Sequence, residues 1–377
     1  MKAQSKTYEV SVKTLTPLHI GSGRELNYNT DYIFFKEKNT LGVVDPEKVL
    51  QIIGAENIEK WVAYIRQRKG IDSYITEILK KTLNPADISS RLIPVKGKGL
   101  NIQNVKEQLY NGTGKPYLPG SSIKGSLRTA LLTQMINEEP EFVAEIDNLQ
   151  KEKRKQGRIS QEFDDSKVNA HYFGDSANND FMRLLRAGDA YFNETNCQLI
   201  TTVNLYDDEW RIKDSINQFV ECIPAGALSE FNFQLFDYGD LALNLIHKNK
   251  DYLFAKDFIS KINEHTLTLL ANEITFWFKN RDLELIEPYY LSLLELKNIA
   301  RQLKDKPDEC LLRVGFGGGF ASMTGDWQYD HLNENDYDEL VYSLRSARYE
   351  GLQFPKTRKF TGSKQPLGFV HLKFKQK

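Results

Sequence analysis

This sequence has few cysteines and no long apolar run, and both absences restrict the class of protein. The three cysteines, Cys197, Cys222 and Cys310, lie at unrelated spacings and form no CxxC pair. Neither a zinc site nor a disulfide framework is indicated, and we expect small buried side chains in a reducing compartment. No run approaches the roughly 18 apolar residues that span a bilayer. The N-terminal residues enter a strand-like pattern without a signal-peptide core. We therefore expect a cytoplasmic protein with no membrane partner, metal or cofactor.

Net charge is also nearly absent, but the charges are unevenly distributed. The 377 residues include 50 Lys or Arg and 51 Asp or Glu, which argues against a dedicated non-specific DNA binder. Residues 91–137 hold seven basic residues and one acid, Glu107, whereas residues 345–377 hold nine basic residues and one acid, Glu350. Residues 326–339 are acidic instead. Basic patches on a neutral chain are typical of a protein that meets phosphate with one face and other proteins elsewhere.

Strand and helix patterns are mixed along the chain. Residues 7–16 alternate in polarity as a half-buried strand does, and residues 228–236 do the same with Phe231, Phe233 and Leu235 on one face. Asp45 followed by Pro46 predicts a capped helix start. Further expected elements are a hairpin (31–37 and 41–44), helices over 46–84, 121–137, 252–303 and 335–348, and strands near 198–206, 311–314 and 367–374. This mixture predicts an α+β protein with antiparallel sheets.

The segment 115–132 predicts a helix start that binds phosphate. Pro119-Gly120 forces a turn, and a serine after it is expected to cap the helix. Free N–H groups and the positive dipole end at such a start favour an anion. A lysine and an arginine four residues apart share one face, and a glycine between them lets a backbone approach. An ordinary capped helix with solvated charges is the alternative. The expected binding residues are Ser121, Ser122, Lys124, Gly125 and Arg128.

A glycine-rich loop follows the strand predicted at 311–314. Glycine permits positive φ and brings amides within reach of a ligand backbone. The loop is no Walker motif, because no GK[ST] follows, and it is a poor dinucleotide fingerprint, because no clear βαβ unit surrounds it. Phe316, Phe320 and Trp327 are interleaved aromatics that either stack on bases or fill the core. The expected binding residues are Arg313, Gly315, Gly317, Gly318 and Gly319.

Two further segments carry candidate residues. Lys356, Arg358 and Lys359 crowd a basic loop before the last strand, which is the electrostatic footprint of nucleic acid unless the run is merely solvated. In TPLHIGSG at 16–23, Gly21 and Gly23 form a tight loop for a close-lying backbone. His19 is a weak candidate for a general base, because no second histidine or paired acid is tied to it in sequence. A structural histidine is the alternative.

These segments, taken in order, resemble the RAMP superfamily of CRISPR proteins. The landmarks are TPLHIGSG at 16–23, PYLPGSSIKGSLRTALL at 116–132, HYFGD at 171–175, RAGDAYF at 186–192, ECIPAGALSEFNF at 221–233, VGFGGGF at 314–320 and PKTRKF at 355–360. Each motif is weak, but the ordered set is specific and covers nearly the whole chain. The length and the late glycine loop are most similar to the terminal RAMP subunit of the type III-A (Csm) effector complex.

This resemblance implies a ferredoxin-like (RRM-like) fold with helical insertions, and two such halves are an open alternative. It implies a RAMP domain over 1–240 with a helical insertion near 46–90, a helical segment over 241–305, and a part over 306–377 that completes the fold. It also implies that the chain binds guide RNA (crRNA) at its 3′ side, close to target RNA, and contacts other subunits of the complex. Maturation of the guide intermediate would be assisted by positioning RNA or by recruiting trimming nucleases.

Two functions of different classes remain open at this point. In the first, the chain is an RNA-binding subunit without chemistry of its own. In the second, it is a metal-independent endoribonuclease of the same superfamily that processes CRISPR RNA with His19 as base. A different RAMP, such as a type III-B subunit, is a third reading.

Overall fold

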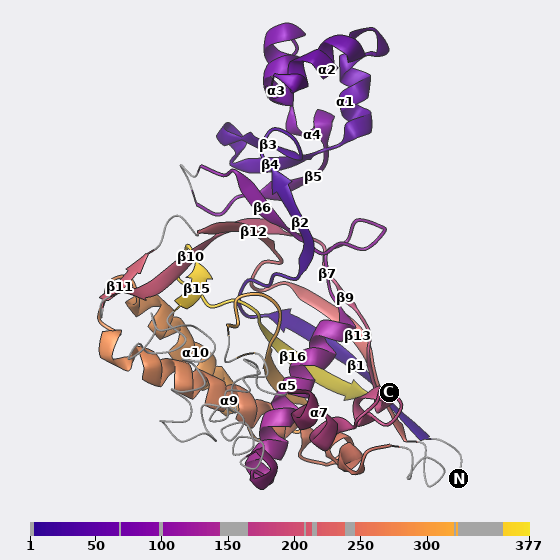
Figure 1. The fold of residues 1–377 in the computed structure, drawn as a ribbon, viewed down its shortest axis with the longest axis vertical. Coiled ribbons are helices and arrows are strands. Elements are labelled where there is room, and N and C mark those ends of the chain that lie inside the picture. The colour runs from indigo at the N-terminus through magenta and orange to yellow at the C-terminus, as the bar shows by residue number, and fades with distance from the viewer. Residues whose placement is uncertain are drawn as a thin grey trace, which may run out of the picture.

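A five-stranded antiparallel sheet is built around β1 (Gln4–Thr14) in the computed structural model of the chain. Its strand order is β14 (Glu309–Arg313), β16 (Phe369–Gln376), β1, β13 (Leu228–Asp237) and β8 (Leu185–Ala187). Helices α5 (Gly120–Glu138) and α9 (Phe258–Trp277) pack on one face of this sheet (Figure 1). The elements β1, α5, β8, β13, α9 and β16 follow the β-α-β-β-α-β order of the ferredoxin-like fold. This confirms the predicted fold class.

The structure describes residues 4–67, 69–97, 101–143, 165–206, 209–212, 217–237, 246–319, 322 and 357–377. The predicted helix over 335–348 lies outside these residues.

The alternating pattern of β1 explains which face of the sheet is covered. Val10 and Val12 are fully buried, whereas Ser11 and Lys13, which alternate with them, are exposed. Successive side chains of a strand point to opposite faces, so the apolar set meets the helices and the polar set meets water. The inward residues of β13 are those predicted from the sequence, which confirms both strands.

Two long helices pack side by side behind β14. α9 continues through a short connection into α10 (Glu287–Leu303), and their shared core is centred on the fully buried Trp277. The predicted helical region over 252–303 is confirmed, with α8 (Asp251–Phe254) as a short turn ahead of α9. On this core lie side chains from β14 and from β15 (Thr357–Thr361), so the helices link two sheets.

The second sheet is mixed. Its order is β11 (Glu209–Ile212), β10 (Asn196–Tyr206), β12 (Gln218–Cys222), β6 (Asn104–Gln108) and β2 (Gly21–Asn27), and β15 also pairs with β10. The pair β6–β12 is parallel, and the other pairs are antiparallel. In the described residues β10, β11 and β12 follow one another without an intervening helix. The sequence leaves two ferredoxin-like halves as an open alternative. In the described residues, the first sheet has the β-α-β-β-α-β order and the second sheet does not.

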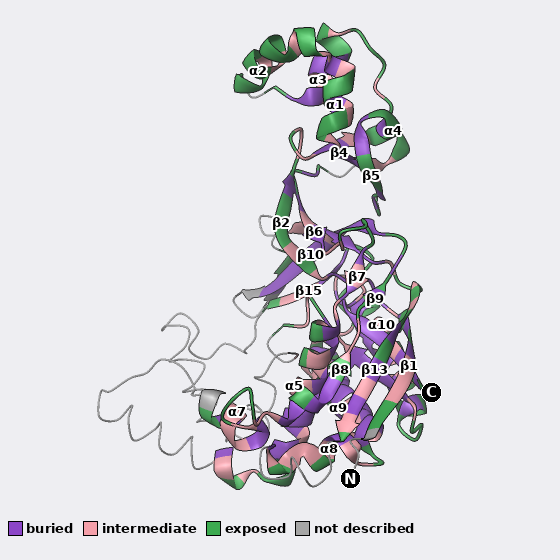
Figure 2. Ribbon diagram, turned by 90° about the vertical axis from the view of Figure 1, so that its right-hand side faces the viewer, coloured by how far each residue is buried: buried purple, intermediate pink, exposed green. Residues whose placement is uncertain are grey.

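A small lobe at one end of the long axis contains the predicted helical insertion (Figures 1 and 2). Its sheet is β3 (Tyr32–Phe35), β4 (Thr40–Val44) and β5 (Ser89–Pro94), which includes the expected hairpin. The Asp45 side chain accepts hydrogen bonds from the Glu47 and Lys48 amides at 3.1 and 3.4 Å, so the predicted cap is confirmed. The helices are α1 (Pro46–Ile53), α2 (Ile58–Arg66), α3 (Ile71–Ser73), a π-helical turn (Tyr74–Ile78) and α4 (Pro85–Ile88).

The remaining elements are short. They are β7 (Tyr117–Leu118) paired with β9 (Ala190–Tyr191), α7 (Asp165–Phe173), and 3₁₀ turns at Lys36–Lys38, Ala55–Asn57, Phe181–Leu184, Lys248–Lys250 and Phe278–Asn280.

All three cysteines are buried free thiols, as predicted. Among the described helices, none has the length and apolarity to cross a membrane. The predicted domain boundaries at 240 and 306 stay a prediction, and β1 and β16 from the two outer parts share one sheet.

Candidate RNA-binding site

The glycine-rich loop after β14 lies directly against the loop at 16–20. The Phe316 amide donates a hydrogen bond to the His19 carbonyl at 3.0 Å. Gly315 has φ of 76°, and a Cβ on it would lie 2.6 Å from that same carbonyl oxygen. Only glycine fits such a position, because both the backbone angle and the space exclude a side chain. Two of the predicted segments are therefore in contact.

The basic segment meets the same loop from the other side. Lys359 on β15 has its Nζ 4.8 Å from the centre of the Phe316 ring. A Cβ on Gly317 would lie 2.8 Å from the Leu367 side chain, which follows the β15 turn. Burial lowers the pKa of Lys359, and the charge of Lys106 on β6 lowers it further. Lys359 thus contributes positive potential beside Phe316, whereas Lys106 forms an ion pair with Glu25 at 3.6 Å. Lys356 lies outside the described residues, as do Phe320 and Trp327.

The start of α5 differs from the prediction. The helix begins at Gly120 with Pro119 as its N-cap, and neither Ser121 nor Ser122 caps it. The Gly120 amide instead donates to the Asp189 carboxylate at 2.8 Å. The serine cap was wrong because this acid arrives from the RAGDAYF segment, 69 residues further along the chain. An anion already occupies this end of the helix, which leaves less potential there for a phosphate.

Lys124 and Arg128 on α5 have different environments. Arg128 forms an ion pair with Asp180 at 2.7 Å and lies 3.7 Å from the centre of the Phe173 ring. Lys124 has no hydrogen bond or ion pair with another described residue, and partial burial lowers its pKa. Arg128 therefore holds α5 against α7, whereas Lys124 has its ammonium group available for a ligand.

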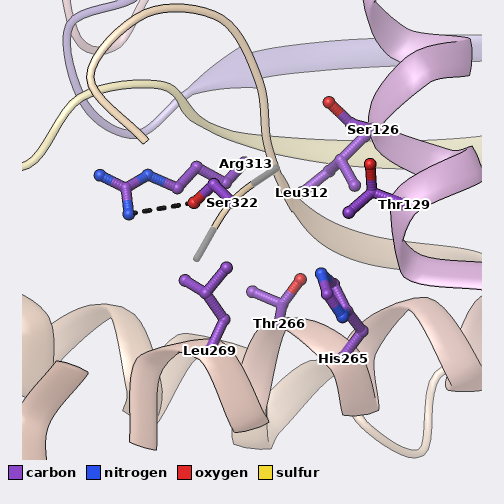
Figure 3. Close-up of a pocket in the computed structure, with 8 residues that line it drawn as sticks. All are labelled: Ser126, Thr129, His265, Thr266, Leu269, Leu312, Arg313 and Ser322. Carbon is purple, nitrogen blue, oxygen red and sulfur yellow. Dashed lines mark hydrogen bonds between the residues drawn. The ribbon is translucent and has the colours of Figure 1, made fainter. Parts of the chain in front are cut away.

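A small cavity lies between the middle of α5 and the base of the glycine-rich loop (Figure 3). The Arg313 side chain crosses this region and donates to the backbone carbonyls of Gly317 and Leu367 at 3.1 and 3.2 Å. It also donates to Ser322 Oγ at 3.4 Å, the contact drawn in Figure 3. The cavity volume of about 10 Å³ suits one water molecule. The other lining residues are Ser126, Thr129, His265, Thr266, Leu269 and Leu312. Arg313 therefore fixes the shape of the loop from below.

Arg358 on β15 is engaged with α9. Its Nε lies 2.8 Å from Glu273 Oε1, and its guanidinium lies 4.0 Å from the centre of the Phe276 ring. Burial opposes ionisation of Glu273, but the Arg358 charge prevails and lowers the pKa of that carboxyl. Arg358 thus holds β15 against α9. The ammonium group of the neighbouring Lys359 instead lies against Phe316 in the glycine-rich loop.

His19 is buried rather than presented to a substrate. Its Nδ1 lies 2.7 Å from the Glu221 carbonyl oxygen, so it donates that hydrogen bond, and its side chain packs edge-on against Phe316. The side of the ring that bears Nε2 lies against Gly21, where an added Cβ would approach to 3.2 Å. Burial lowers the pKa of His19 to about 4. A general base must reach the proton that it removes, so this geometry favours the structural alternative.

A buried ionic group that sequence reasoning missed lies next to His19. We call it the Arg91 cluster; its members are Arg91, Glu107, Tyr110, Thr195 and Glu221. Arg91 Nη2 donates to Glu107 at 2.9 Å and to Glu221 at 3.3 Å. Glu221, with no exposed surface, also accepts from the Tyr110 hydroxyl and from Thr195 Oγ1. The signal was a charged residue between the apolar Val220 and Cys222, but its partners lie far away in sequence.

The predicted glycines divide by the space around them. The tight loop predicted at Gly21 and Gly23 was wrong, because both residues lie in the irregular start of strand β2, which pairs with β6. Gly23 and Gly319 have positive φ, and nothing lies within 4 Å of an added Cβ. Gly125 is exposed and equally open. Gly318 lies close to Ser322, whose Cβ would be 2.6 Å away. The open glycines could admit a ligand backbone, whereas Gly315 and Gly317 serve the packing of the loop itself. Among the described residues no cluster of acids, histidines or cysteines could hold a metal ion.

Comparison with known proteins identifies the family. The model of the RAMP superfamily matches residues 11–322. A protein named CRISPR system Cms protein Csm5 from Methanocaldococcus jannaschii is 27% identical over 345 residues, which cover 89% of this chain and 76% of that protein. A protein of the same name from Streptococcus thermophilus is 28% identical over 147 residues, which cover 35% of this chain and 40% of that one.

Two solved structures share the fold. One is a chain in a cryo-EM structure of a Csm–crRNA–target RNA ternary complex of a type III-A CRISPR–Cas system, with a TM-score of 0.68 and 20% identity, covering 97% of this chain and all of that one. The other is a crystal structure of Csm5 from T. onnurineus, with a TM-score of 0.60 and 20% identity, covering 96% of this chain and 99% of that one. Since the family model spans most of its length, this chain belongs to the RAMP superfamily.

Proposed function

We propose that this chain is a guide-RNA-binding subunit of a type III-A CRISPR effector complex, where it caps the 3′ side of the guide and assists maturation of the guide intermediate. The observation that carries the proposal is the convergence of three segments on Phe316: the loop at 16–20, the glycine-rich loop and the basic β15 strand. The relatives named Csm5 and the fold shared with a chain of a Csm–crRNA–target RNA complex support it.

The surface around Phe316 has the chemistry that a ribose-phosphate chain requires. Lys359 on β15 supplies positive charge beside Phe316, and Lys364 in the β15 turn adds a second cation. Lys106, on β6 of the same sheet, is partly offset by Glu25 at 3.6 Å. Neutralising phosphates releases counterions, so such contacts dominate affinity for RNA and weaken with salt. Contacts to the backbone carry no base sequence, which suits a subunit that holds guides of varied sequence.

The test is the guide RNA that copurifies with the complex. In cells that express Lys359→Ala/Lys364→Ala, or Lys124→Ala, we expect the complex to contain less guide RNA, or guides with altered 3′ ends. The matched control is Lys38→Ala/Lys60→Ala, which removes two exposed lysines from the helical lobe. Guides of unchanged yield and length in both basic-surface variants would contradict the proposal. Loss of the subunit itself from the complex would point to a fault in assembly, which the control also monitors.

A further inference from the structure

A hollow of about 670 Å³ with both polar and apolar lining lies beside the proposed RNA surface. Asn196 and Gln198 on β10 form part of its lining, together with Gln365 from the β15 turn and Lys96 from the segment after β5. Pro17 and Pro224 contribute apolar wall. Its volume falls within the range of about 300–1,000 Å³ that is usual for sites of small organic groups. None of the lining residues that the structure describes is acidic, so an electronegative ligand meets no carboxylate among them.

The two amide side chains on β10 are only half satisfied. Gln198 Nε2 donates to Asn196 Oδ1 at 2.8 Å, and the two residues are 7% and 5% exposed. Within the described part of the chain, neither Asn196 Nδ2 nor Gln198 Oε1 has a hydrogen-bond partner. One amide donating to the other always leaves one amino group and one carbonyl for a ligand. Both atoms face the solvent-accessible hollow, so the pair is available to a ligand that offers an acceptor beside a donor.

The hollow adjoins the surface on which the proposed function depends. The Gly362 amide in the β15 turn donates to the Leu199 carbonyl at 2.7 Å, which fixes the turn at the edge of the hollow. Ile200, the next residue after Gln198 on the same face of β10, belongs to the small core against which Phe316 packs. A chain that runs over Phe316 and Lys359 therefore passes the mouth of the hollow.

We propose that this hollow receives one unpaired base of the bound RNA; this inference rests on the proposed function. A nucleobase has apolar faces and a polar edge, which match the proline and leucine walls and the amide pair. On its Watson–Crick edge every base presents a donor next to an acceptor, so the amide pair accepts each of the four. Lys96 is placed to meet the phosphate. A protein side chain that anchors an interface is commonly aromatic or apolar, and it would leave the amide pair unsatisfied.

Abasic scanning of a short single-stranded RNA tests the inference. In a series of oligonucleotides, one nucleotide at a time loses its base while its phosphate stays, and binding to the purified chain is measured by fluorescence anisotropy. We expect one abasic position to weaken binding about tenfold, the size of one base contact. Gln198→Leu should weaken binding of the intact RNA by a similar factor and abolish the sensitivity to the abasic position.

Two further variants keep the inference open to refutation. Ala225→Trp fills the mouth of the hollow from an exposed turn, so it tests the site without removing a buried hydrogen bond. Gln51→Leu, an exposed glutamine on α1, is the matched control and should leave binding and the abasic profile unchanged. Lys359→Ala should weaken binding of every oligonucleotide equally and keep the abasic profile.

The outcomes separate this inference from the proposed function. If the wild-type chain and its complex do not bind RNA, the proposed function fails. If they bind RNA but no abasic position matters, the base site is refuted while RNA binding stands. If Gln198→Leu and Ala225→Trp bind RNA normally yet lose a neighbouring subunit in copurification, the hollow is a protein-docking site and the inference is overturned.

Discussion

The apolar core beneath β1 and the Arg91 cluster stabilise one chain by opposite physical means. Val10, Val12 and Leu372 lie under α5 and α9 with no exposed surface, and each contributes roughly in proportion to the area that it buries. Glu221 is equally buried, but a charge without a partner in such a place is costly. The core therefore tolerates graded losses, whereas the cluster depends on all of its members together.

The largest expected effect breaks the cluster. Glu221→Ala leaves Arg91 with Glu107 alone and removes the acceptor of Tyr110 and Thr195, so we expect the free energy of unfolding to fall by about 3–5 kcal/mol. Urea denaturation measures it. Arg91→Ala should cost clearly less in the Glu221→Ala background than in the wild type, because the two residues act as a unit. Additive losses would mean that the pair contributes no coupling.

An intermediate effect is expected in the apolar core. Leu372→Ala on β16 should lower the free energy of unfolding by about 3 kcal/mol, through lost burial and the cavity that remains. Lys375→Ala, on the exposed face of the same strand, is the control and should change it by less than about 0.5 kcal/mol. Equal effects of the two substitutions would show that the covered face of this sheet has been assigned to the wrong side.

The pH dependence tests the cluster through its neighbour His19, and His265 on α9 is a second buried histidine whose pKa burial lowers to about 4. In the folded chain the pKa of His19 is lowered from 6.5 to about 4, so between these values the unfolded state binds the extra proton. Stability is then lost as the pH falls, and we expect His19 to account for about 2 kcal/mol between pH 7 and pH 5. Denaturation curves at pH 7 and pH 5 should show a smaller difference in the free energy of unfolding for His19→Gln than for the wild type. An unchanged difference would contradict the lowered pKa of His19.

The smallest effect comes from a carboxylate near the surface. Asp45→Ala removes the cap of α1, and we expect a loss of about 1 kcal/mol, well below that of Glu221→Ala. Asp45→Asn should retain most of the stability, since asparagine caps equally well. Hydrogen exchange of the Glu47 and Lys48 amides reports the change locally. If Asp45→Ala lowered the free energy of unfolding as much as Glu221→Ala does, burial would not explain the different contributions of the two carboxylates to stability.

Local patterns predicted the elements, and long-range partners decided the site. The alternation of β1 and β13 and the cap at Asp45 depend on neighbours in sequence, so they could be read directly. The partners of the arginines could not: Arg128 pairs with Asp180 and Arg358 with Glu273, across 52 and 85 residues. The sequence shows only that these arginines and lysines are basic. In the structure, some of them are held in ion pairs inside the protein, and others remain available at the surface. The hollow at Asn196 and Gln198 arises only where β10 meets the β15 turn.

The pairing of β1 with β16 has a consequence for biosynthesis. Tyr8 lies opposite Gln376 in this register, so β1 waits for a strand that is translated much later before its second edge is covered. While the chain is still on the ribosome, β1 retains an open edge that can pair with other nascent chains. Such long-range closure slows folding, so yield during expression should depend on chaperone supply and on slow translation more than on the stability of the finished protein.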